Sequence, residues 1–337
     1  MSDSRLEFGI ILGDVPIGVD GAAHFDRVLR QVEVAQRSGL TYICIGQHFL
    51  YDDYRWLQPI PLLARLAAEV GQETKLVTSV VIAPFYHPVV LAEELATLDI
   101  VSRGQLIVGI GAGYRPREFE LLQVPIEERY QRFEEALELI TTAWSEDEFS
   151  FSGRFWQLED AKTHVRPVQQ PRPELWMGAM KSVGIRRAAR LGDTWMVTPE
   201  TSFAEVEEGI TTFDAERRRC DLPQARLPIR REIVFAEDSD TALEVYAARA
   251  RERYLAYAAR GQQILAGDRG GIEGEFRDWA RERAFVGTPA ECVAGLAELD
   301  STRLGPVIVR PSWPGMSGEE VIAYIDELGE KVVSQLR

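Results

Sequence analysis

Several features that would indicate other classes of protein are missing from this sequence. Its 337 residues include three cysteines and four histidines, with neither a CxxC pair nor an HExxH motif, so no metal site is predicted. No apolar run approaches the roughly 18 residues of a membrane-spanning helix, and the first residues lack a signal-peptide pattern. The net charge of −15 disfavours nucleic-acid binding, which needs a basic face. We therefore expect a cytoplasmic protein with reduced thiols that binds no metal, membrane or nucleic acid.

What the sequence does contain is typical of a globular protein with a large core, since 45% of the residues are hydrophobic and 27% are charged. Strand-like segments rich in Ile, Val and Leu recur along the chain. They do not alternate strictly between apolar and polar residues, which is typical of strands buried on both faces of a parallel sheet. The predicted strands are Phe8–Leu12, Tyr42–Gly46, Leu76–Ile82, Leu106–Ile110, Leu175–Gly178, Thr194–Val197, Arg230–Ala236 and Pro306–Arg310.

Helical patterns fill the intervals between these strands, about eight times. This alternation predicts a single α/β domain over residues 1–337, folded as a (β/α)8 TIM barrel. The rival is an open doubly wound sheet, which a GxGxxG motif after the first strand would favour, and residues 13–18 do not provide one. Segments 148–166 and 240–285 interrupt the alternation of strands and helices. The first has the pattern of a β-hairpin, and the second is predicted to be helical. We interpret both as insertions in the βα loops, which build the active site of a barrel.

Residues 87–120 form one αβ step: an apolar helix, a tight turn, a buried strand and the glycine loop Gly111-Ala112-Gly113-Tyr114. Glycines at the C-terminal end of a strand let a flat ligand lie against the backbone. By itself such a loop is a weak signal, because many are plain turns. Arg115 and Arg117 lie near this loop, and the alternative is that Arg115, Glu118 and Arg129 form a structural ion-pair set.

A second candidate ligand site follows the strand that ends at Gly178. A short polar loop leads to a helix that begins near Ser182, and free N–H groups at a helix N-terminus bind anions. Lys181 adds a full positive charge, and the Ser182 hydroxyl could contact a phosphate. The alternative is that Ser182 only caps the helix.

His48 ends the second predicted strand, where barrel enzymes carry catalytic residues. Its imidazole could exchange a proton near neutral pH, or it could only hydrogen-bond a neighbouring loop. The aromatic residues Trp56, Phe85 and Trp313 lie on presumed βα loops. They could wall an apolar substrate pocket or simply pack together.

Residues 87–120, 176–195 and 285–293 together resemble the bacterial-luciferase-like flavin and deazaflavin oxidoreductases. The resemblance is specific from residue 6 to about 197 and looser after residue 284. It implies that His48 is catalytic and that Gln47, where the family more often has an acid, contacts substrate. It also implies a non-proline cis peptide at Ser79–Val80. The cofactor-binding residues implied are Ser79, Val80, Gly111, Ala112, Gly113, Tyr114, Gly178, Ala179, Lys181, Ser182, Val183 and Gly184.

The resemblance leaves two chemistries open. The first, which we favour, is a homodimeric monooxygenase that uses O2 and reduced FMN from a separate reductase to oxygenate a small apolar substrate. The second is hydride transfer with a deazaflavin coenzyme. It is favoured by Ala112, since the luciferases proper carry an arginine there that helps to hold the flavin phosphate. A third hypothesis is a non-catalytic flavin-binding protein.

Overall fold

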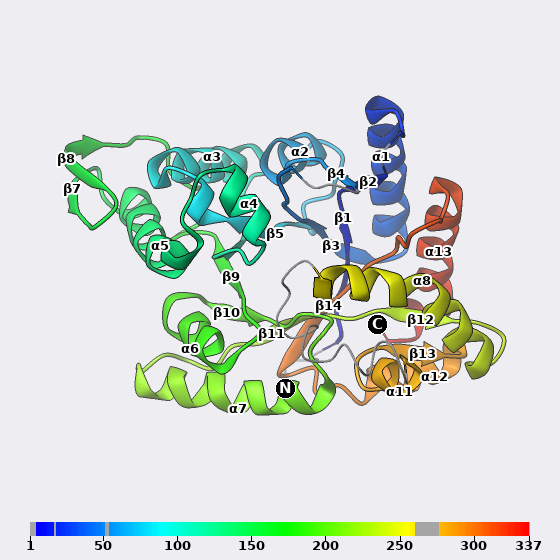
Figure 1. Ribbon diagram of the computed structural model, residues 1–337. Helices are drawn as coiled ribbons and strands as arrows, with labels where there is room; N and C mark the ends of the chain where they lie inside the picture. The colour runs from blue at the N-terminus through cyan, green and yellow to red at the C-terminus, as the bar shows by residue number, and fades with distance from the viewer. Residues whose placement is uncertain (1–4, 17, 51–53, 260–275, 337) are drawn as a thin grey trace. The chain divides into compact units, whose positions relative to one another are not determined.

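Eight parallel strands of the computed structural model, which describes residues 5–16, 18–50, 54–259 and 276–336, form one sheet (Figure 1). Their order is β10-β9-β6-β5-β3-β1-β14-β11, and an isolated parallel bridge between Val197 and Ile229 links its two ends. The predicted TIM barrel is confirmed. The strands are β1 (Phe8–Leu12), β3 (Leu40–Ile45), β5 (Lys75–Ile82), β6 (Leu106–Gly111), β9 (Glu174–Gly178), β10 (Thr194–Met196), β11 (Leu227–Arg230) and β14 (Leu304–Val309).

Helices alternate with these strands, and three of them begin with a reciprocal capping box that fixes the first turn: Ser202 with Glu205, Thr288 with Glu291, and Ser317 with Glu320. None of the helices in the described ranges is long and apolar enough to cross a membrane. Their bounds are α1 (Gly21–Arg37), α2 (Pro59–Leu66), α3 (Pro88–Val101), α4 (Pro116–Leu121), α5 (Arg129–Ser145), α6 (Ser182–Leu191), α7 (Phe203–Arg219), α8 (Ser239–Ala259), α11 (Phe276–Arg281), α12 (Pro289–Ala297) and α13 (Gly318–Lys331), with short 3-10 turns at Ala83–Phe85, Ile126–Glu128 and Val333–Gln335.

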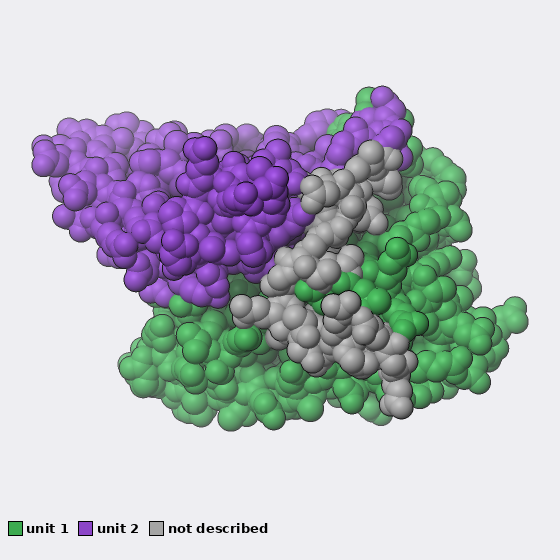
Figure 2. Space-filling model, viewed as in Figure 1, with its two compact units in different colours: residues 1–12, 22–44, 176–337 green, residues 13–21, 45–175 purple. Residues whose placement is uncertain are grey.

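The chain divides into two compact units, which Figure 2 colours separately. Unit 1 comprises residues 1–12, 22–44 and 176–337, and unit 2 comprises residues 13–21 and 45–175. Within unit 2, the indole N–H of Trp144 on α5 donates to the carbonyl of Ala92 on α3 at 2.9 Å. The apolar stripe of α5 is buried: Phe133, Leu137, Ile140 and Trp144.

Segment 148–166 contains an antiparallel hairpin, as its pattern predicts, made of β7 (Glu148–Ser152) and β8 (Gln157–Lys162). The carboxylate of Glu135 on α5 holds the turn, because it accepts hydrogen bonds from three consecutive backbone N–H groups, residues 154–156, at 2.9–3.0 Å. A Cβ on Gly153 would lie 2.0 Å from this carboxylate, so a larger residue there would displace the Glu135 side chain. A second antiparallel pair joins β2 (Asp14–Pro16) to β4 (Tyr54–Trp56).

The single strand predicted for Arg230–Ala236 is wrong, because the structure has two strands there. β11 ends at Arg230, and β12 (Ile233–Phe235) pairs with β13 (Phe285–Gly287) in a separate two-stranded sheet. Between them the fully buried guanidinium of Arg231 donates to the carbonyls of Thr198 and Thr201, each at 3.0 Å. These bonds fix the chain where it leaves the barrel sheet.

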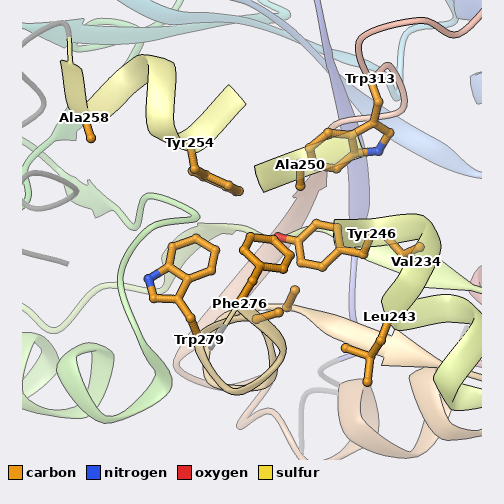
Figure 3. Close-up of a cluster of buried hydrophobic side chains, with 11 residues drawn as sticks. Val234, Leu243, Tyr246, Ala250, Tyr254, Ala258, Phe276, Trp279 and Trp313 are labelled. Carbon is orange, nitrogen blue, oxygen red and sulfur yellow. The ribbon is translucent and has the colours of Figure 1, made fainter. Parts of the chain in front are cut away.

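Segment 240–285, predicted as a helical insertion, contains α8 and α11, while residues 260–275 lie outside the described ranges. An apolar cluster in unit 1, here called the α8 cluster, joins the two helices to β12 (Figure 3). The hydroxyls of Tyr246 and Tyr254 both donate to one carboxylate oxygen of buried Glu232, at 2.8 and 2.5 Å. The cluster consists of Val234, Leu243, Tyr246, Ala250, Tyr254, Ala258, Phe276, Trp279, Ala280, Ala284 and Trp313.

Candidate functional site

His48 follows the C-terminal end of β3 and faces a buried carboxylate within unit 2. Its Nδ1 lies 3.1 and 3.3 Å from the two carboxylate oxygens of Glu118 on α4. The side chain of Glu118 is 2% exposed, that of His48 is 14% exposed, and the backbone N–H of Phe49 also donates to Glu118, at 2.6 Å. When Nδ1–H donates to the carboxylate, Nε2 carries the lone pair of a base. Glu118 thus faces His48, and its membership of an ion-pair set with Arg115 and Arg129 stays a prediction.

Aromatic rings flank the imidazole of His48. The ring of Trp56 lies edge-on at a centroid distance of 4.9 Å, and that of Tyr114 at 6.2 Å. Gly46 makes room for the indole, since a Cβ there would lie 2.9 Å from it. Two of the predicted site residues, Trp56 and Tyr114, are thus brought together with His48.

Phe85 lies on the short turn after β5 and is half-buried. Its ring packs at 4.6 Å from that of Phe119 and at 5.9 Å from that of Phe49. Phe49 directly follows His48, so this packing supports the loop that carries the imidazole. A contact between Phe85 and substrate remains a prediction.

Gln47 is buried, and both ends of its side-chain amide are used within unit 2. Its oxygen accepts from the N–H of Ile82 at 2.9 Å, and its nitrogen donates to the hydroxyl of Tyr86 at 2.6 Å and to Gln58 at 3.1 Å. Burial raises the pKa of Tyr86, so this hydroxyl stays protonated at neutral pH. These bonds tie the end of β3 to the end of β5. The predicted contact of Gln47 with substrate remains a prediction.

The predicted cis peptide between Ser79 and Val80 is present. The pairing of β5 with β6 shifts at this point, so that Ser79 and Val80 lie opposite the single residue Gly109. A Cβ on Gly109 would lie 1.8 Å from the carbonyl oxygen of Thr78, so only glycine allows this approach. The result is a bulge at which Val80 is half-buried and Ser79 is 8% exposed.

The glycine loop after β6 packs closely against other residues of unit 2. Gly113 has φ of 76°, in the left-handed region that favours glycine, and a Cβ there would lie 2.8 Å from Ile82 and 3.0 Å from Phe119. Gly111 is buried, whereas Ala112, Gly113 and Tyr114 are partly accessible. A short backbone surface beside His48 is therefore open to a ligand.

The second predicted cofactor segment, residues 178–184, lies in unit 1 at the start of α6. The N-cap residue is Lys181, and no side chain caps the helix, so the predicted alternative of Ser182 as N-cap is wrong. The indole N–H of Trp195 holds the loop by donating to the carbonyl of Ala179 at 2.9 Å. Gly184 packs closely on Ala179, since a Cβ on Gly184 would lie 3.0 Å from that residue. Uncapped first-turn N–H groups beside exposed Lys181 suit a phosphate.

Trp313, the last predicted substrate-binding residue, is 7% exposed and lies in the α8 cluster. Its ring packs at 5.6 Å from that of Tyr246, and the guanidinium of Arg253 lies 5.0 Å from its centroid. Packing is the role that these contacts support. Substrate contact by Trp313 remains a prediction.

Comparison with known proteins identifies the family. Residues 6–304 match the family described as luciferase-like monooxygenase. This chain belongs to that family. The prediction of a luciferase-like oxidoreductase, an enzyme, is thereby confirmed.

Among the described residues, no group of three or more His, Cys, Asp or Glu side chains could hold a metal ion.

The curated relatives of this luciferase-like chain differ in cofactor. The oxygenase component of a flavin-dependent trigonelline monooxygenase from Acinetobacter baylyi is 29% identical over 223 residues, 65% of this chain and 61% of the relative. An F420-dependent glucose-6-phosphate dehydrogenase from Amycolatopsis mediterranei is 33% identical over 171 residues, 49% of this chain and 50% of the relative. The chain thus spans about half to three fifths of these relatives' length.

A solved structure confirms the fold at low sequence identity. The oxygenating constituent of 3,6-diketocamphane monooxygenase from Pseudomonas putida, solved in complex with FMN, superposes with a TM-score of 0.81. The identity is 16%, and the alignment covers 98% of this chain and 99% of that chain. At this identity, the likeness shows the TIM-barrel fold alone.

Proposed function

We propose that this chain is the oxygenase component of an FMN-dependent monooxygenase, which oxygenates a small organic substrate with a mainly apolar body. A separate reductase would supply the reduced FMN. The observation that carries the proposal is the His48 imidazole held by the buried carboxylate of Glu118, in the same unit as the bulge at Ser79–Val80. The trigonelline monooxygenase relative, itself an oxygenase component, supports the same division of labour.

The residues present fit a flavin. The bulge opposite Gly109 and the glycine loop after β6 offer backbone against which a flat ring could lie. In unit 1, taken by itself, the uncapped N-terminus of α6 with Lys181 offers an anion site of the kind that a flavin phosphate needs. Bound reduced FMN would supply the two electrons for the reaction with O2.

His48 would accept or donate the proton at the reacting oxygen, with Glu118 fixing the orientation of its ring. The rings of Trp56 and Tyr114 beside the imidazole would keep water away from the reacting atoms. The same rings suit a substrate with an apolar body.

Deazaflavin-dependent hydride transfer is the second candidate. Two observations favour it: the small Ala112 in the glycine loop, and the F420-dependent relative at 33% identity. In that chemistry O2 is not a substrate. The same His48 would act as acid or base at the substrate oxygen.

The deciding experiment titrates the purified protein with oxidised FMN, reduced FMN and the deazaflavin coenzyme, followed by absorbance and fluorescence. We expect tight binding of reduced FMN, with O2 consumption when an unrelated flavin reductase supplies it. Preference for the deazaflavin would replace the proposal with the second candidate. Binding of neither would remove the cofactor assignment altogether. If flavin binds but no reductant and substrate give turnover, and His48→Ala changes neither result, the protein is a non-catalytic flavin binder.

The homodimer implied by the resemblance is part of this proposal. Helix α3 exposes Val90, Ile100 and Val101, with 42–51% of each side chain accessible, and a second copy would cover them. Sedimentation velocity at micromolar concentration should give twice the 38.0 kDa chain mass. A monomer at every concentration would contradict it.

A further inference from the structure

Arg230 is the last residue of β11, and its side chain lies on the inner face of the sheet. Arg230 is in register with Ile308 on the neighbouring strand β14, so the two side chains share a face. The side chain of Ile308 reaches toward Gly9 on β1, as does that of Tyr42 on β3. The ring of Tyr42 stacks at 6.0 Å on Trp176, from a strand that is not its neighbour in the sheet. A contact across non-adjacent strands identifies this face as the barrel interior.

The charge of Arg230 also affects a side chain on β3. Cys44 lies two residues after Tyr42 on β3 and therefore shares its face. Burial raises the pKa of the Cys44 thiol to about 12, and the positive charge of Arg230 acts in the opposite direction. β3 and β11 are separated by two strands in the sheet, so the effect acts between strands that are not neighbours, as expected for two side chains on the inner face. The thiol is neutral and provides no counter-charge.

Arg230 differs from the other interior arginines of unit 1 in its partners. Fully buried Arg231 donates three hydrogen bonds to carbonyl oxygens, and Arg217 does the same. The half-buried guanidinium of Arg230 forms neither an ion pair nor a hydrogen bond with any residue in the described ranges. Holding an uncompensated charge partly out of water is unfavourable unless a ligand neutralises it.

Arg310 adds a second positive charge on the same face. It lies two residues beyond Ile308, just after β14 ends, so its side chain follows that of Ile308 along the interior. Arg310 is buried, and its charge lowers the pKa of Glu232 against the larger, opposite effect of burial. Arg310 therefore acts electrostatically on a carboxylate, and Glu200 is a second buried carboxylate that acts on Glu232 and on Arg231. The Arg230 guanidinium at the end of β11 forms no hydrogen bond or ion pair with either of them or with any other described residue.

We propose that Arg230 binds an oxyanion, a carboxylate or phosphate group, on the substrate of this enzyme. That the ligand is a substrate rests on the proposed function. The inference narrows the substrate class to molecules with an apolar body and one anionic group. The C-terminal edge of the strands is where barrel enzymes bind their substrates. A planar guanidinium on a strand end gives the bidentate geometry that carboxylates and phosphates require.

The test uses the full chain without flavin, so it does not depend on the proposed chemistry. Thermal shift and isothermal titration calorimetry would compare sodium benzoate, phosphate and sulfate with sodium chloride at equal ionic strength, and benzoate with neutral benzamide. We expect at least one oxyanion to bind and benzamide not to bind. Arg230→Met should weaken that binding on the order of 10-fold to 100-fold, and Arg230→Lys less. Arg218→Met, which changes an exposed arginine on α7, should leave it unchanged.

Equal oxyanion binding by wild type and Arg230→Met, or no binding by wild type, would overturn the inference. If Arg230→Met fails to fold, the comparison of Arg230→Lys with wild type decides it instead. A parallel arm tests whether the oxyanion belongs to the cofactor. If Arg230→Met weakens FMN binding but not riboflavin binding, the charge serves the cofactor phosphate and the inference fails. Failure of the proposed function would appear separately, as absence of any flavin binding in a protein that still binds the oxyanion.

Discussion

The carboxylate that faces His48 comes from Glu118, 70 positions along the chain, while the neighbouring Gln47 is neutral. Gln47 must donate to the hydroxyl of Tyr86 and also accept from the N–H of Ile82. An amide does both, whereas a carboxylate can only accept. The two tasks, holding two strand ends together and orienting the imidazole, are therefore divided between two residues.

If Glu118 acts through His48, the effects of their substitutions will not add. We expect His48→Ala to lower turnover on the order of 100-fold or more. Glu118→Gln should lower it about tenfold or more, because the amide keeps the shape but not the charge. The double variant should be no slower than His48→Ala alone. Single-turnover rates and flavin affinity would be measured for all three. A double variant slower by the product of both effects would assign Glu118 a purely structural role.

At the scale of elements, the bulge of β5 depends on the residue opposite it in β6. The carbonyl of Thr78 occupies the space that a side chain on Gly109 would take. The hydroxyl of Thr78 in turn donates to the carbonyl of Gly109 at 2.8 Å. The shape of the predicted ring site is thus set by a backbone contact between neighbouring strands.

Gly109→Ala should destabilise unit 2, because its Cβ would lie 1.8 Å from a backbone oxygen that cannot move alone. We expect a loss of about 1–3 kcal/mol in the free energy of unfolding, measured in urea, and weaker flavin binding. Gly21→Ala is the matched control, since a Cβ at Gly21 meets nothing within 4 Å. Equal stability of the two variants would contradict the account of the bulge.

Two tyrosines of helix α8 hold the helix to the rest of unit 1, because both donate to one carboxylate oxygen of Glu232. Tyr246→Phe and Tyr254→Phe should each destabilise the protein by about 1–3 kcal/mol, because a buried carboxylate loses a donor. Hydrogen exchange should accelerate in α8 more than in α5. Tyr130→Phe, at a tyrosine with 43% of its surface exposed, serves as the control. Unchanged exchange in α8 would show that apolar packing alone holds the helix.

At the scale of the whole molecule, carboxylates whose pKa is lowered in the folded chain make stability sensitive to acid. Hydrogen bonds from Arg219 and Arg190 lower the pKa of Glu216 from 4.5 to about 2 and join α6 to α7. Above pH 4.5 this carboxylate is ionised in the folded and unfolded chains, so its stabilising effect is fully present. Between pH 4.5 and about 2 the unfolded chain takes up the proton first, so that stabilisation is lost. Among the described residues, five other carboxylates have lowered pKa values: Asp238, Glu291, Asp300, Glu319 and Glu320.

The melting temperature should therefore fall as the pH drops from 5 to 3. Glu216→Gln should reduce this fall, because the glutamine does not titrate. Glu208→Gln, at an exposed position on the same helix, should not change it. Circular dichroism melts at half-unit pH intervals measure all three proteins. A Glu216→Gln profile parallel to that of wild type would remove Glu216 from the acid response.

Local pattern by itself determined much of this protein. Runs of β-branched and aliphatic residues predicted the barrel, and β1 lies at Phe8–Leu12 as predicted, because burial on both faces leaves a continuous apolar signature. The amino-acid sequence of the β5 segment resembles that of the family, and this resemblance predicted the cis peptide at Ser79–Val80. Local sequence suffices where the determining contacts lie within one element.

Tertiary structure decided what depends on residues far apart in the sequence. The strand predicted over Arg230–Ala236 splits because the buried guanidinium of Arg231 finds carbonyls about 30 positions away. Glu118 meets His48 only because the ends of parallel strands gather at one edge of a sheet. That Arg230 forms no hydrogen bond or ion pair with the described residues is likewise a result of folding, because it depends on which side chains the fold brings near it. Such partners cannot be predicted from local pattern, because periodicity gives the face of a residue but not its neighbours.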